Sequence, residues 1–150
     1  VKKAIHYAYF SGMPPLADDG GIEVEALNGE PGVKSRRWPG YEASDEELIE
    51  MMLNKMKEVP WEKRQARFRV CLAFVMPNED EVWVREGAHA GYIAESPGQF
   101  VPVYPFRSLF WLPEFGKTLG ELTPDEEAGA VLHRKKALIE LLPVIKEKLV

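Results

Sequence analysis

Two adjacent aspartates, Asp18 and Asp19, run directly into two glycines in the segment "LADDGGIEVEAL". Neighbouring side chains on an extended chain point in opposite directions, so one carboxylate can face a cleft while the other is tied to the scaffold. Glycines beside a carboxylate leave space and accessible backbone N–H groups, which suits Mg²⁺ and phosphate oxygens. Asp-Gly pairs are also common in ordinary turns, and spacing alone favours that interpretation.

Basic side chains form two further groups that could meet an anionic ligand. Lys34, Arg36 and Arg37 follow a Pro-Gly turn, and His133 and Arg134 place two hydrogen-bond donors side by side in a predicted helix. Short basic runs are usually solvated surface, and without further context that interpretation is favoured for both groups.

The composition limits the class of protein. The 150 residues are 45% hydrophobic and 29% charged, which is typical of one globular domain. The net charge of −5 argues against a bulk nucleic-acid or anionic-membrane binder, but not against a small phosphorylated ligand. Cys71 lies in an apolar run and is predicted to be a small buried side chain. With no membrane-length apolar run and no signal-peptide pattern, the sequence predicts a soluble, cytoplasmic protein.

The first half of the chain alternates between helical and extended patterns. Apolar residues at helical spacing predict a helix over 4–9, and a short strand is expected to enter a turn at Gly20-Gly21. Alternation over 22–26 predicts a strand with one solvated face. A helix over 44–57 is expected because Ser44 and Glu47 form a capping box.

The second half predicts a hairpin and a long final helix. Residues 67–76 read as a central strand, "PNEDE" as a turn, and residues 82–94 as the returning strand. A short strand is expected near "SLFWL" within a loop over 95–116. The final helix is expected to begin at Thr123, with a kink or restart at Pro143. The class is α/β in one domain.

Several segments, taken in order, resemble the inosine triphosphate pyrophosphatase family. The family pattern is Asp-Asp-Ser-Gly followed by Ala-Leu-x-Gly-x-Pro-Gly-Val-x-Ser-x-Arg, with Thr-x-x-Glu-Leu and Ser-His-Arg segments farther on. The matching segments here are "DDGG" (18–21), "ALNGEPGVKSRR" (26–37), "EGAHAGYIAE" (86–95), "PEFGKTLGEL" (113–122) and "HRKKAL" (133–138).

This resemblance implies a fold and an assembly. The expected architecture is ITPase-like (Maf/Ham-type): an α/β fold whose mixed, elongated central sheet carries flanking helices and holds a nucleotide in a central cleft. It implies a single domain over residues 1–150, usually found as a homodimer.

The resemblance also implies a reaction. Family members hydrolyse ITP, dITP and XTP to the monophosphate and pyrophosphate with Mg²⁺. Asp19 would be the catalytic carboxylate, binding the metal or activating water, and Gly20 would contact substrate through its backbone. His133 and Arg134 would read the base, because buried donors reward a 6-oxo purine and clash with the amino group of adenine.

The sequence departs from the family pattern at three places. Nothing before Asp18 resembles the family's Thr/Ser-x-Asn-x-x-Lys phosphate-binding segment, and Leu132 stands where the Ser of Ser-His-Arg is expected. The base-binding Gly-Phe-Gly-Tyr-Asp-Pro loop is replaced by "VPVYPFRSLFW", which puts Arg107 or Ser108 in the place of its aspartate.

These departures leave three functional interpretations. The leading one is a nucleoside triphosphate pyrophosphatase with altered base selectivity, in which Arg107 contacts the substrate. The second is a non-catalytic nucleotide-binding or dimeric structural relative of the same fold. The third is a house-cleaning enzyme that acts on another modified nucleotide.

Overall fold

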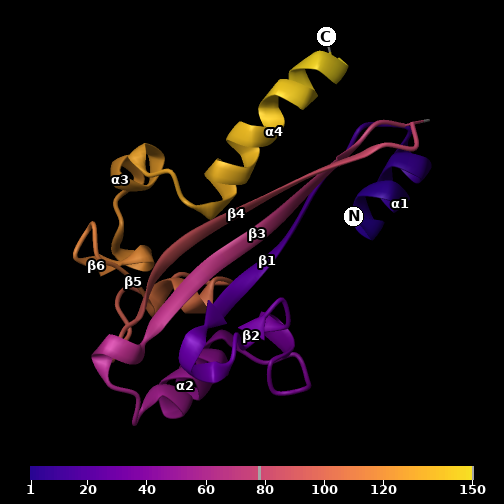
Figure 1. Ribbon diagram of the computed structural model, residues 1–150. Coiled ribbons are helices and arrows are strands. Elements are labelled where there is room, and N and C mark those ends of the chain that lie inside the picture. The colour runs from indigo at the N-terminus through magenta and orange to yellow at the C-terminus, as the bar shows by residue number, and fades with distance from the viewer. Residues whose placement is uncertain (78, 150) are drawn as a thin grey trace. The chain divides into compact units, whose positions relative to one another are not determined.

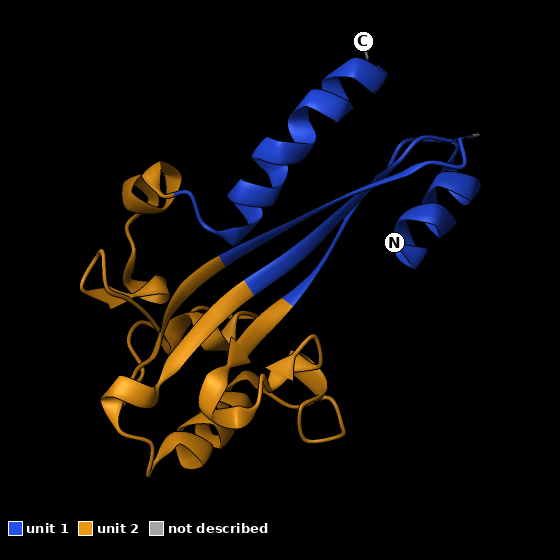
Figure 2. Ribbon diagram, viewed as in Figure 1, with its two compact units in different colours: residues 1–20, 69–88, 131–150 blue, residues 21–68, 89–130 orange. Residues whose placement is uncertain are grey.

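The computed structural model describes residues 1–77 and 79–149. Within them the chain forms two compact units, coloured separately in Figure 2. Unit 1 comprises residues 1–20, 69–88 and 131–150, and unit 2 comprises residues 21–68 and 89–130.

Six strands are found in the described residues, and they form one sheet in the order β2-β1-β3-β4-β5-β6 (Figure 1). They are β1 (Leu16–Val24), β2 (Pro31–Gly32), β3 (Gln65–Val75), β4 (Val82–Ile93), β5 (Phe110–Leu112) and β6 (Lys117–Thr118). The α-helices are α1 (Lys2–Ser11), α2 (Asp45–Met56), α3 (Pro124–Gly129) and α4 (His133–Leu149). Short 3₁₀ turns include η1 (Glu25–Leu27) and η4 (Pro105–Ser108).

The predicted α/β class with flanking helices is confirmed. Strand β1 pairs with β2 through Ile22 and Gly32, and β4 pairs with β5 through Tyr92 and Trp111. These pairs, and the pair β5 and β6, are antiparallel, which refines the mixed sheet that the resemblance implies. Antiparallel strands can be joined by a short connection, as β5 and β6 are by residues 113–116, whereas parallel strands need a long crossover.

In unit 1 a strand buried on both faces carries the core. Residues Val70, Leu72 and Phe74 of β3 pack with Ala137 and Leu141 of α4. Ala73 and Val75 of the same strand pack with Ala4 and Ala8 of α1, and Figure 2 shows the two helices on either side of the strand ends. Successive side chains of a strand point to opposite faces, so two helices are needed to cover both. The predicted central strand is therefore confirmed, together with its apolar second half.

In unit 2 the helix α2 begins where the sequence predicts. Ser44 Oγ accepts from the Glu47 backbone N–H at 3.2 Å, and a Glu47 carboxylate oxygen accepts from the Ser44 N–H at 2.8 Å. This reciprocal pair satisfies two helix N–H groups that otherwise lack partners. The buried face of the helix consists of Leu48, Met52 and Met56.

The turn predicted at Gly20-Gly21 is wrong, because β1 runs straight through both glycines. A Cβ on Gly20 would collide with the backbone carbonyl of Arg69, and a Cβ on Gly21 would collide with the carbonyl of Gly32. These glycines let neighbouring backbones approach closely, which is another common use of the residue in strands. The space beside them is therefore occupied by backbone.

The prediction of one continuous final helix from Thr123 is also wrong, because the structure has two helices there. Thr123 and Glu126 form the predicted capping box, but they start the short helix α3, and the chain at Ala130 is extended. A new helix, α4, begins at His133 and continues through Pro143.

The remaining element predictions agree with the structure. Helix α1 ends at Gly12, whose φ of 66° lies in the left-handed region that favours glycine. The alternating strand over 22–26 ends two residues early, at Val24. The turn expected at 77–81 includes residue 78, which lies outside the described residues. Across residues 1–77 and 79–149, none of the helices has the length and apolar character needed to cross a membrane.

Candidate functional site

The two aspartates of β1 have different surroundings. Asp18 Oδ2 accepts a hydrogen bond from Arg134 Nε at 2.9 Å, and the two residues are 116 positions apart in the sequence. Both side chains are about half exposed, at 49% for Asp18 and 55% for Arg134. Asp19 is exposed and has no hydrogen-bond or ion-pair partner among the described residues. One carboxylate is thus bound by the scaffold and its neighbour is available for chemistry.

The first turn of α4 is seated against β4 by backbone contacts. The carbonyl of His133 lies where a Cβ on Gly87 would be, so only glycine allows this approach. Lys136 Nζ donates to the carbonyl of Ala88 at 2.9 Å. Because His133 and Arg134 open this helix, the contacts with β4 fix the positions of both donors.

Four of the five site residues predicted from the sequence therefore lie in unit 1. These are Asp19, Gly20, His133 and Arg134. Asp18 joins them through its bond to Arg134, although only its neighbour was predicted to act. The resemblance assigns Arg134 to the base, but in this structure its Nε is bound to a carboxylate.

The fifth predicted residue, Arg107, lies in η4 of unit 2 and makes its ion pair there. Arg107 Nη2 donates to Glu127 Oε2 at 2.7 Å, while its Nε is buried without a hydrogen-bond partner. Ser108, the other residue considered for this place, is fully buried, and its hydroxyl donates to the carbonyl of Pro105 at 2.7 Å. Arg107 is thus the residue of this pair that can still offer a donor.

Two carboxylates of the segment after η4 have lowered pKa values. Lys117 Nζ donates to Glu126 at 2.8 Å, and this bond is the main reason that the pKa of Glu126 is lowered. The backbone N–H and the hydroxyl of Thr118 both donate to Glu121 and lower its pKa. Both carboxylates are therefore committed to stabilising the structure around them.

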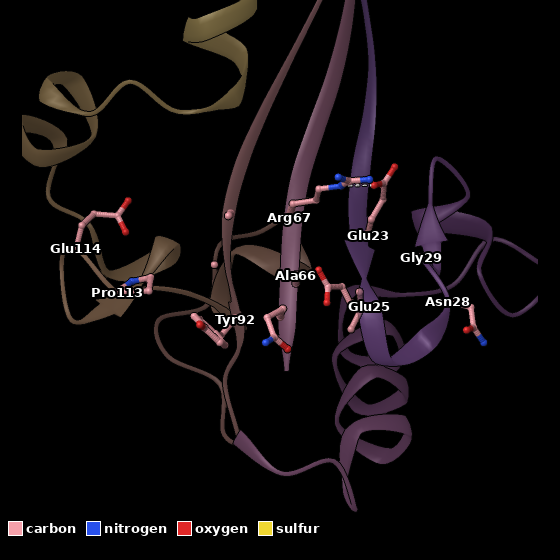
Figure 3. Close-up of a pocket in the computed structure, with 13 residues that line it drawn as sticks. Glu23, Glu25, Asn28, Gly29, Ala66, Arg67, Tyr92, Pro113 and Glu114 are labelled. Carbon is pink, nitrogen blue, oxygen red and sulfur yellow. Dashed lines mark hydrogen bonds and ion pairs between the residues drawn. The ribbon is translucent and has the colours of Figure 1, made fainter. Parts of the chain in front are cut away.

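A pocket of about 620 Å³ lies in unit 2, and none of the predicted site residues lines it (Figure 3). Arg67 and Glu23 point toward one another across its wall, with Nε and Oε2 2.5 Å apart. Tyr92 and Glu114 line it from other elements. No motif in the sequence indicated this pocket, because its residues come together only when the strands pair.

The side chains available to a metal ion are few. Among the described residues there is no group of three or more His, Cys, Asp or Glu side chains that could hold a metal ion. Mg²⁺ needs fewer, since it is commonly held by one or two carboxylates together with substrate phosphates and water. An exposed, unpaired Asp19 fits that requirement, whereas the bond from Arg134 to Asp18 already neutralises the second carboxylate.

Comparisons with known proteins establish the family. A sequence profile of the Ham1 family matches residues 1–144. The dITP/XTP pyrophosphatase of Yersinia pseudotuberculosis serotype I (strain IP32953) is 39% identical over 148 residues, covering 98% of this chain and 74% of the relative. The chain therefore belongs to the Ham1 family.

Solved structures support the same assignment. A HAM1 protein from Coxiella burnetii superposes with a TM-score of 0.83 at 34% identity, covering 97% of this chain and 74% of that one. A nucleoside-triphosphatase / dITP/XTP pyrophosphatase from Mycobacterium abscessus has a TM-score of 0.77 at 37% identity, with coverages of 95% and 73%.

Proposed function

We propose that this chain is a nucleoside triphosphate pyrophosphatase that hydrolyses deaminated purine nucleotides such as ITP, dITP and XTP to the monophosphate and pyrophosphate. The observation that carries the proposal is the contrast within β1, where Asp18 is bound by Arg134 and Asp19 is exposed and unpaired. The names of the relatives in the same family support the substrate class.

Asp19 is proposed as the catalytic carboxylate. Water attacks phosphorus on the α side of the α–β bridge, the bridging P–O bond breaks, and pyrophosphate leaves. An exposed carboxylate without a competing partner can accept the proton of the attacking water or hold a cation beside the phosphates. Gly20 has no side chain and would contact the substrate through its backbone. A side chain at this position would collide with β3.

Mg²⁺ is the proposed cofactor, and Asp19 would hold it. When bound, the ion would supply charge neutralisation for the phosphate oxygens and the leaving group. The free carboxylate of Asp19 suits an ion whose remaining ligands are substrate oxygens and water.

His133, Arg134 and Arg107 are proposed to contact the substrate, the first two at the base. Arg134 has further N–H groups besides the Nε that binds Asp18, so it can keep this bond and still donate. Arg107 has further N–H groups besides the Nη2 that binds Glu127, so it too can donate to a substrate oxygen.

We propose three further properties that the sequence leads us to expect. These are a single ITPase-like domain over 1–150, a homodimer, and a cytoplasmic location. Light scattering of the purified chain measures the assembly directly, and a monomer at micromolar concentration would contradict the dimer.

The function is tested by pyrophosphate release with Mg²⁺ from ITP, XTP, dITP, GTP and ATP, beside Asp19→Asn. Release that disappears in the variant supports the proposal. A folded protein that releases no pyrophosphate from any of them contradicts it.

The alternative is a non-catalytic nucleotide-binding relative. This alternative is favoured because Arg134 and Arg107 each donate to a carboxylate, which leaves fewer donors for a substrate. Binding of ITP without turnover would support this alternative.

A further inference from the structure

Another pocket of unit 2 brings two tryptophans together with two glutamates. It has a volume of about 470 Å³, and its walls come from the turn before β3, the segment after β4, and the region of β5 and β6. Among the described residues that line it, the aromatic ones are Trp61 and Trp111 and the charged ones are Glu95 and Glu121. All four belong to unit 2, so the pocket lies within one compact unit.

The aromatic walls are fixed by ring contacts. The planes of Trp61 and Trp111 differ by 81°, and their ring centroids are 6.2 Å apart. Trp61 also stacks on Tyr92, with 17° between the planes and 5.4 Å between the centroids. Tyr92 and Trp111 are paired residues of β4 and β5, so the sheet holds both neighbours of Trp61 in place. Trp61 nevertheless remains 41% exposed, which leaves aromatic surface for a ligand.

Both glutamates give the pocket negative charge. Glu95 is exposed and accepts no hydrogen bond from the described residues. Glu121 Oε2 accepts from the Thr118 backbone N–H at 2.8 Å and from the Thr118 hydroxyl at 2.7 Å. These bonds lower the pKa of Glu121, so it is ionised at neutral pH. Because the donors of Thr118 are uncharged, they hold this carboxylate in place without neutralising it.

The basic side chains that act on these carboxylates donate elsewhere. Arg64 interacts electrostatically with Glu95, and Lys117 with Glu121. Arg64 is only 3% exposed, and its guanidinium donates to four backbone carbonyls. Lys117 Nζ donates to Glu126 at 2.8 Å. Neither basic residue lines the pocket, so the charge that a ligand would meet at its wall is negative.

We propose that this pocket binds a small organic cation of the quaternary or N-methylated ammonium class. The faces of aromatic rings attract a cation within about 6 Å of the ring centroid, and tryptophan does so most strongly. Methyl groups on the nitrogen give such a cation an apolar surface that can lie against an indole ring, while nearby carboxylates attract its charge. Trp61 and Trp111 supply the rings, and Glu95 and Glu121 supply the charge.

Titration calorimetry with choline, at constant ionic strength, tests the proposal. We expect saturable binding of one choline per chain. The uncharged carbon isostere of choline has the same shape and should bind about tenfold more weakly, because it lacks the cation that the rings and carboxylates attract. Equal binding of the two molecules, or no saturable binding of choline at millimolar concentrations, would overturn the proposal.

Variants assign the binding to this pocket. Trp61→Leu should weaken choline binding about tenfold, because leucine is apolar but has no aromatic face, and Trp61→Phe should restore part of the loss. Glu95→Gln should weaken binding about threefold and make it less dependent on salt. Glu62→Gln is the matched control, since Glu62 is exposed and next to Trp61 but does not line the pocket, and it should stay within about twofold of wild type.

The outcomes separate binding at this pocket from folding and from the proposed function. Wild-type affinity in both Trp61→Leu and Glu95→Gln would overturn the assignment to this pocket. If Trp61→Leu does not fold, Glu95→Gln decides, because it changes an exposed side chain that accepts no hydrogen bond from the described residues. None of these readouts depends on nucleotide turnover, so failure of this proposal and failure of the pyrophosphatase proposal are distinguishable.

Discussion

The two units are stabilised by different means. In unit 1, β3 is buried on both faces by apolar side chains of α1 and α4. In unit 2, irregular segments are tied down by side chains that bind backbone groups. Arg64 donates to four backbone carbonyls there. Arg36 donates to the Val103 carbonyl, and Asp45 accepts from the Val103 N–H.

The difference shows which parts of the molecule can change independently. Alternating apolar residues define a packed strand whatever its loops contain, and the strand β1 with its two aspartates depends on such packing. A loop without a repeating pattern needs individual polar bonds to hold one conformation. The segment over 101–111, where the sequence departs most from the family pattern, is of this second kind.

The largest expected effect is on turnover. Asp19→Asn should lower kcat by a factor on the order of 10²–10⁴ and leave the thermal midpoint unchanged, because Asp19 is exposed and unpaired. Asp18→Asn is the matched control for folding, since it breaks an exposed ion pair worth at most about 1 kcal/mol. A melting transition that collapses in Asp19→Asn would assign that residue a structural role.

The packing of unit 1 is tested by Leu141→Ala. Leu141 is fully buried against β3, so we expect a loss of about 2–5 kcal/mol in the free energy of unfolding. Leu142 is the next residue of the same helix and is 37% exposed, so Leu142→Ala should cost less than about 1.5 kcal/mol. Urea denaturation measures both, and equal losses would contradict the proposed core.

The polar ties of unit 2 are tested by Arg64→Met. Arg64 is only 3% exposed, and its guanidinium donates to the carbonyls of Met56, Val59, Ile93 and Ala94 at 2.7–3.1 Å. Burial lowers the pKa of Arg64, yet arginine stays protonated in proteins. Methionine would leave these acceptors without a donor, and we expect a loss of about 2–3 kcal/mol.

The exposed arginine of the same region provides the control. Arg67→Met removes an ion pair with Glu23 in which the arginine side chain is 57% exposed, so its cost should stay below about 1 kcal/mol. Chemical denaturation at neutral pH compares the two variants. A larger loss in Arg67→Met would contradict the view that buried backbone ties, and not ion pairs as such, stabilise unit 2.

The smallest expected effect is on the stability of the protein at acidic pH. The Thr118 backbone N–H, followed by its hydroxyl, lowers the pKa of Glu121 from its ordinary value of 4.5. The resulting stability is therefore fully present above about pH 4.5 and is lost as the pH falls through the lowered value. Glu121→Gln should reduce the acid dependence of the urea midpoint relative to wild type, and an unchanged dependence would contradict this assignment.

Periodicity and capping predicted the regular elements well. The Ser44 and Glu47 box, the apolar half of β3 and the strand β4 follow from local patterns, because each depends on residues near in sequence. The failures came from contacts that no local pattern contains. The sequence predicted a turn at Gly20 and Gly21, but the absence of side chains at these positions leaves room for backbone carbonyls of β3 and β2.

The candidate site divides in the same way. The ordered motifs indicated Asp19, His133 and Arg134, yet nothing in the sequence joined Asp18 to Arg134 across 116 positions. Nor did any pattern indicate that Glu127 would bind Arg107, or that an ion pair would hold Val103 in a strained turn.

The sequence alone determined the α/β class, the family and the residues able to do chemistry, because these depend on periodicity and on residue types in order. The tertiary structure decided which aspartate is neutralised and which is free, since that depends on where α4 seats its first turn. It also decided that Val103 has a φ of 73°, in the region that favours glycine. The hydrogen bonds that hold it there come from Asp45 and Arg36, which lie 58 and 67 positions away in the sequence.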